Sequence, residues 1–264
     1  MNNTEPKTTE WPPPKDVFFL LIITFGLLMV SPIVLDQLGI LSMDSKWQLM
    51  LGECLIIVPA LFYIRKKQLP AQVAFRLNKV QPPVLIISFA MAFPLTLLFE
   101  EINLIIEKFL PMPEEIVQLY KQFFTADTTS DWIFLLLIVV ILAGVFEEMI
   151  FRGLLQQVLE NALDITRAIL ATAFVFALMH GNPFAVVQIV FLGVIIGVLA
   201  WRSNSIWPAA VVHATNNLIS IILVNTTEEN LTFMEWHGHI NPIFLIIAVA
   251  LLYYLMKEFY RITE

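Results

Sequence analysis

The sequence predicts an all-α fold, a polytopic membrane bundle of about eight transmembrane helices. The chain is 58% hydrophobic and only 14% charged, whereas soluble domains are roughly 45–50% apolar and about 25% charged. The mean hydropathy is +0.79, and apolar residues are spread along the whole length, which favours one bundle over a soluble domain with an anchor. The net charge of −7 and the lack of a basic arm or cluster of the kind that binds nucleic acid argue against nucleic acid as a partner.

Eight segments are apolar enough to cross or nearly cross a bilayer, which takes about 20 helical residues. Backbone groups in lipid must be hydrogen-bonded internally, so these segments should be helices. They cover residues 16–40, 47–65, 82–108, 132–159, 166–181, 184–202, 206–225 and 240–258. A further segment, 111–124, has apolar residues at helical spacing and predicts an amphipathic helix at the membrane surface. In the sixth segment, Gly193 and Gly197 form a Gly-x-x-x-Gly pattern that lets two helices approach closely.

The polar residues 1–15 predict a short cytoplasmic tail, and residues 16–264 predict a single transmembrane bundle. Lys and Arg concentrate in cytoplasmic loops of membrane proteins. The loop after the second predicted helix, residues 65–79, contains five of them, which places this loop in the cytoplasm. With an even number of crossings, both termini are then expected to be cytoplasmic.

Three ionisable residues lie within the fourth apolar segment: Glu147, Glu148 and Arg152. Each such group costs about 2.5–3.5 kcal/mol at the bilayer centre, so the three require mutual pairing or a water-filled cavity. Residues four apart share a helix face, which predicts an ion pair between Glu148 and Arg152 and turns Glu147 elsewhere. Glu147 is therefore the candidate general base, with Glu148 and Arg152 in a supporting role. The alternative is a purely structural cluster that holds two helices together.

Two histidines in later apolar segments could complete a site. Phe176 precedes His180 by one helical turn, so its ring should restrict the orientation of the imidazole. A histidine near a helix end is, by itself, more often structural. His213 and Asn217 are also one turn apart, so an imidazole and a carboxamide project from one face. Two donors aimed at one point could stabilise an oxyanion.

Taken together and in this order, three motifs resemble the CAAX protease and bacteriocin-processing (CPBP, or Abi) family of intramembrane glutamate proteases. The motifs are Glu147-Glu148-x-x-x-Arg152, Phe176-x-x-x-His180 and His213-x-x-x-Asn217. The resemblance covers about residues 130–225, which would form the catalytic core. It implies that Glu147 and His180 activate a water molecule and that His213 and Asn217 form the oxyanion hole. Glu148 and Arg152 fall on the second glutamate and the arginine of the first motif.

The resemblance implies an intramembrane endopeptidase whose partners are the lipid bilayer and a peptide or membrane-protein substrate. Many family members look bacterial, so we expect a bacterial plasma membrane, where the prenylated C-terminal CAAX tails of the family name are not expected. The sequence leaves the substrate open between peptide pheromones, bacteriocin leaders and another membrane protein. No cofactor is expected, because the sequence lacks a His-Glu-x-x-His helix and contains the motif asparagine. A zinc-dependent variant is the alternative, since a glutamate with two histidines is a possible ligand set.

Two readings from other functional classes also fit a polar cavity in the membrane. The first is a non-enzymatic scaffold or a bacteriocin self-immunity protein that binds a partner through this cavity. The second is an ion or solute carrier. The carrier is disfavoured because corresponding halves of the chain contain no paired, interrupted helices of the kind common in transporters.

Overall fold

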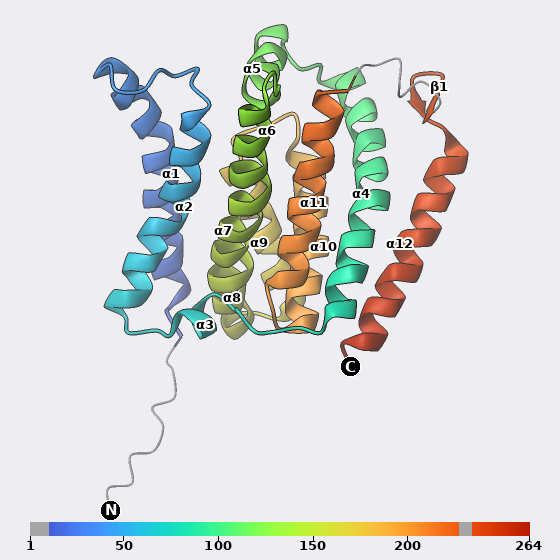
Figure 1. Ribbon diagram of the computed structural model, residues 1–264. Coiled ribbons are helices and arrows are strands. Elements are labelled where there is room, and N and C mark those ends of the chain that lie inside the picture. Colours follow the sequence, from blue (N-terminus) through green and yellow to red (C-terminus); the bar gives the residue numbers. More distant parts are fainter. Residues whose placement is uncertain (1–10, 227–233) are drawn as a thin grey trace, which may run out of the picture.

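The computed structural model describes residues 11–226 and 234–264 and shows a bundle of helices that run up and down (Figure 1). The predicted tail, residues 1–15, lies mostly outside the described residues. All eight predicted segments are helical. Their bounds are α1 Pro14–Gln37, α2 Trp47–Lys66, α4 Pro82–Phe109, a compound helix over 129–162, α9 Ile165–Met179, α10 Val186–Ser203, α11 Trp207–Val224 and α12 Pro242–Ile262. Shorter elements are α3 Ala71–Ala74, α5 Glu114–Phe124, β1 Glu235–Trp236 and β2 His239–Ile240.

Within the described residues, seven of these helices are long and apolar enough to cross a membrane. The eighth, α9, has 15 residues, and at 1.5 Å per residue it is shorter than the roughly 30 Å hydrocarbon core. The prediction of a polytopic helical bundle is confirmed. The prediction of about eight spans corresponds to seven full-length helices and one shorter apolar helix.

The apolar run in the sequence predicted a helix here without any irregularity. The helix over residues 129–162 is instead not uniformly α-helical. A capping box between Thr128 and Asp131 fixes its start. Two stretches then follow i→i+5 hydrogen bonding, a rare pattern that is frequent at functional sites. The successive parts are α6 Thr129–Leu135, the π-helical η1 Leu136–Leu142, α7 Ala143–Glu148, the π-helical η2 Met149–Leu155 and α8 Gln156–Ala162. The α-helical turn that carries both glutamates therefore lies between two widened segments.

The helices α1 and α2 form a hairpin on one side of the bundle, and α12 packs against α4 on the other side (Figure 1). The helix α11 is central, because it contacts α4, α7 and α10, while α9 packs against α8 and α10. One apolar core joins α1 and α2 to η2, α8 and α9, and a second joins α4, α10, α11 and α12. These contacts bring α7, α9 and α11 together from separate parts of the chain.

Glycines set the closest helix approaches. A Cβ atom at Gly144 would lie 2.8 Å from the Cβ of Ala214, so α7 and α11 come together here only because residue 144 lacks a side chain. A Cβ atom at Gly193 would lie 2.9 Å from the Cβ of Ala173. The close approach predicted from Gly193 and Gly197 is therefore confirmed, and it joins α10 to α9.

The loops after α2, α8 and α10 lie at one end of the bundle, where α1 begins and α12 ends (Figure 1). The loop after α2 is the basic one on which the predicted orientation rests. The helix α5 lies at the opposite end and buries none of its residues, which agrees with the predicted amphipathic helix. A cytoplasmic location for the basic end remains a prediction.

We predict that Gly144→Ala will lower the free energy of unfolding by about 1–3 kcal/mol, because the added methyl group overpacks the contact with Ala214. Gly26 in α1 provides a matched control, since nothing lies within 4 Å of a Cβ atom built there. Gly26→Ala should be neutral or stabilise by up to about 1 kcal/mol. Unfolding of the purified variants in detergent measures both effects. Equal stabilities would show that the α7–α11 contact does not require the glycine.

Candidate active site

The aromatic ring of Phe176 in α9 lies at the centre of the predicted site residues. Its centroid is 4.6 Å from that of His180, which directly follows α9, and 5.7 Å from that of His213 in α11. The guanidinium carbon of Arg152 in η2 lies 4.1 Å from the same centroid, a cation–π contact. The predicted neighbourhood of Phe176 and His180 is confirmed. The contacts of Phe176 with Arg152 and His213 were not predicted.

A buried polar network connects three helices. Arg152 and Glu148 form the predicted ion pair at 3.1 Å, with both side chains fully buried. The other terminal nitrogen of Arg152 donates to the carbonyl of Gly193 in α10, and Glu148 Oε1 lies 2.9 Å from His213 Nδ1. A buried ion pair compensates its desolvation only when further hydrogen bonds satisfy it. Gly193 and His213 supply such bonds here.

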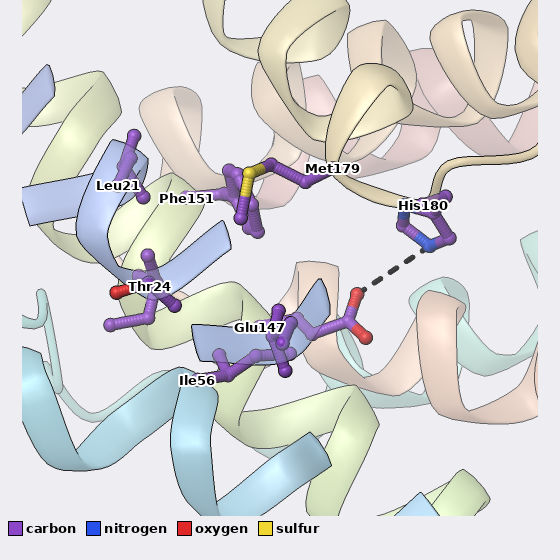
Figure 2. Close-up of a pocket in the computed structure, with 9 residues that line it drawn as sticks. Leu21, Thr24, Ile56, Glu147, Phe151, Met179 and His180 are labelled. Carbon is purple, nitrogen blue, oxygen red and sulfur yellow. Dashed lines mark ion pairs between the residues drawn. The ribbon is translucent and has the colours of Figure 1, made fainter. Parts of the chain in front are cut away.

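Glu147 points away from Arg152, toward the two histidines. Its Oε2 atom lies 3.7 Å from Nε2 of His180 and 4.0 Å from Nε2 of His213. Figure 2 shows the first of these ion pairs. Both distances exceed a direct hydrogen bond. The side chains of Glu147 and His180 are 12% and 30% exposed, so this half of the site is accessible while Glu148 and Arg152 are sealed.

The Nδ1 atoms of both imidazoles are held by acceptors. His180 Nδ1 lies 2.8 Å from the carbonyl oxygen of Phe176, and a carbonyl can only accept, so this nitrogen carries the proton. His213 Nδ1 faces Glu148, and an ionised carboxylate likewise only accepts. Each ring therefore presents its Nε2 atom to Glu147. In both rings the proton on Nδ1 is therefore held by an acceptor.

Asn217 lies one turn after His213 in α11, as expected, but its described hydrogen bond goes elsewhere. Its Nδ2 atom donates to the carbonyl of Val139 in η1 at 2.9 Å. A carboxamide nitrogen has two hydrogens, so one remains for another acceptor. The structure thus brings His213 against both glutamates and attaches Asn217 to the π-helical segment that precedes them.

A cavity of about 70 Å³ opens beside Glu147 and His180 (Figure 2). This exceeds the space needed for one water molecule. The remaining walls are mostly apolar and come from α1, α2, η2 and the end of α9. These walls consist of Leu21, Thr24, Leu28, Ile56, Ile150, Phe151 and Met179. The glutamate and the histidine therefore border a small cavity whose other walls are mostly apolar.

Sequence reasoning missed one carboxylate. Glu53 in α2 interacts electrostatically with Glu147, and its Oε2 atom is buried without a hydrogen-bond partner in the described structure. The available signal was the same one that revealed Glu147, an ionisable residue within an apolar segment. The described residues contain no group of three or more His, Cys, Asp or Glu side chains arranged to hold a metal ion.

Residues 129–219 match the family model of the Type II CAAX prenyl endopeptidase Rce1-like proteins. The matched residues include all three motifs, so the resemblance to CAAX proteases is confirmed. At the level of the family, the match supports an intramembrane endopeptidase of the CAAX type. Neither the curated proteins nor the solved structures include a match to this chain.

We predict that Arg152→Met will lower the free energy of unfolding by about 3–5 kcal/mol, because it leaves the charge of Glu148 buried and uncompensated. Adding Glu148→Gln should recover a large part of that loss. Arg167→Met is the control, since its ion pair with Asp164 is exposed and should contribute less than about 1 kcal/mol. Unfolding in detergent distinguishes these cases. A double variant as unstable as Arg152→Met would contradict the charge argument.

Proposed function

We propose that this protein is an intramembrane endopeptidase in which Glu147 and His180 activate a water molecule that attacks a peptide bond. One observation carries the proposal: the carboxylate of Glu147 faces the Nε2 atoms of two imidazoles whose Nδ1 atoms are held by acceptors. Glu147 and His180 are thus two proton-accepting groups that line the same cavity. The family match supports the reaction class.

The proposed first step follows from the distance between Glu147 and His180. At 3.7 Å they do not bond directly, but one water molecule can lie within hydrogen-bond reach of both. Neutral His180 carries its proton on Nδ1, so Nε2 accepts from the water, as does the carboxylate of Glu147. As the water oxygen attacks the carbonyl carbon, its proton passes to Glu147. That proton then goes to the amide nitrogen as the carbon–nitrogen bond breaks.

The proposed oxyanion hole consists of His213 and Asn217. Nδ1 of His213 already donates to Glu148, so Nε2 can donate to an oxyanion only if the ring is an imidazolium. The carboxylates of Glu147 and Glu148 both face this ring and would balance its charge. The second amide hydrogen of Asn217, which its bond to Val139 leaves free, would complete the pair of donors.

Glu148 and Arg152 would support the reaction without touching the substrate. Glu148 orients His213, and Arg152 balances the charge of Glu148. The apolar cavity walls beside Glu147 suit a substrate that approaches within the membrane. We therefore infer a peptide or membrane-protein substrate whose scissile bond has apolar neighbours.

We predict that Glu147→Gln will reduce cleavage by at least about 100-fold, because an amide cannot accept the proton of the water. The measurement compares membrane and secreted peptides from cells lacking the protein and complemented with wild type or variant at equal expression. Glu107→Gln is the control, since Glu107 is an exposed carboxylate near the end of α4. A product seen with wild type and Glu107→Gln but not with Glu147→Gln supports proteolysis.

The same experiment tests the alternative of a scaffold or self-immunity protein. A binding role should survive Glu147→Gln, because the substitution preserves the shape of the side chain. If the peptide profiles match and the wild-type phenotype persists in this variant, the protease proposal is wrong. The binding role then becomes the better account.

We further propose that catalysis requires no metal ion. The expected result is that a zinc chelator leaves cleavage in isolated membranes unchanged, because the carboxylate and the imidazole activate the water themselves. A zinc-dependent endopeptidase treated in parallel shows that the chelator is effective. Loss of cleavage that added zinc restores would favour the metal-dependent alternative.

A further inference from the structure

A third carboxylate, Glu53, faces the proposed active site from outside the family-matched segment. It belongs to α2, which packs against α7, η1 and η2. Ile56 lies three residues later, on the same helix face, and lines the cavity beside Glu147 (Figure 2). That face of α2 is therefore directed at the site. The carboxylates of Glu53 and Glu147 are close enough to interact electrostatically.

Both carboxylates have an oxygen atom that is buried and without a hydrogen-bond partner in the described structure, Oε2 in each case. A buried ionised carboxylate needs a cation or several donors to compensate its lost hydration. Arg152 of η2, which packs against α2, is already paired with Glu148. Two negative charges that interact without a shared cation would also repel each other.

Protonation of Glu53 would remove both the unsatisfied charge and the repulsion between the two carboxylates. A neutral Glu53 carries an O–H group that needs an acceptor, and an ionised Glu147 offers the unpartnered oxygen. The resulting bond would satisfy two buried groups and remove the repulsion. It would also hold Oε2 of Glu147, the oxygen that faces the two histidines, in a fixed position.

We propose that Glu53 is a positioning residue that, as a neutral carboxylic acid, donates a hydrogen bond to the carboxylate of Glu147. This inference rests on the proposed function of Glu147 as the base that activates water. Glu53 fixes the rotamer of that base and does not contact the substrate. The N-terminal helix pair would thereby contribute to a site whose motifs all lie between residues 129 and 219.

The activity test compares Glu53→Gln with Glu53→Leu. An amide keeps a donor at the same position, so Glu53→Gln should retain cleavage within about threefold, whereas Glu53→Leu should reduce it by about 100-fold through misplacement of Glu147. The readout is the cleavage product found only in cells with the wild-type protein. Cys54→Leu is the control, because Cys54 is the next residue of α2 and is exposed.

Cleavage that is retained in Glu53→Gln but lost in Glu53→Leu would show that the residue acts through its hydrogen bond and not through packing alone. Wild-type cleavage by Glu53→Leu would overturn the proposal, as would equal loss in both Glu53 variants. If no product depends on the wild type, or Glu147→Gln still cleaves, the proposed function fails instead.

An infrared measurement tests the bond without relying on activity or on the leucine variant. The difference spectrum between purified wild type and Glu53→Gln at neutral pH should show the loss of a protonated carboxylic acid band. Loss of an ionised carboxylate band would overturn the proposal even if cleavage follows the expected order.

Discussion

The arrangement of the site depends on the buried ion pair between Glu148 and Arg152. Neither charge has access to water, so each needs partners from neighbouring helices. Arg152 donates a hydrogen bond to the carbonyl of Gly193 in α10 and lies over the ring of Phe176 in α9. Glu148 accepts a hydrogen bond from His213 in α11. Satisfying one charge pair thus fixes four parts of the chain relative to one another. Glu147 is adjacent to this pair, and its position follows from it.

The compound helix adds a second constraint. The two glutamates occupy a short α-helical segment with π-helical stretches before and after it. A π-helical turn changes which residues share a face relative to an α-helix. It also changes the pairing of backbone groups, and the carbonyl of Val139 in η1 accepts a bond from Asn217. The irregular backbone of this helix and its contact with α11 are therefore coupled at the place where the motifs meet.

Features that depend on spacing within one helix could be predicted from the sequence. The eight apolar segments, the pairing of Glu148 with Arg152 and the proximity of Phe176 to His180 all follow from periodicity and length. Contacts between helices could not be predicted in this way, because periodicity says which face is apolar and not which helix covers it. The bonds of His213 to Glu148 and of Asn217 to Val139 belong to this second kind. The π-helical stretches have no simple sequence signal either.

The position of Glu53 shows that segments outside the three motifs also contribute residues to the proposed site. The polar groups of the three motifs lie within residues 129–219, the matched segment. The cavity beside them is lined by Leu21, Thr24 and Leu28 of α1 and by Ile56 of α2. A chain that kept its motifs but changed this hairpin would therefore keep the proposed catalytic groups and alter the walls that a substrate would meet. Substrate choice is thus expected to depend on α1 and α2, and the reaction on the segment that follows together with Glu53 of α2.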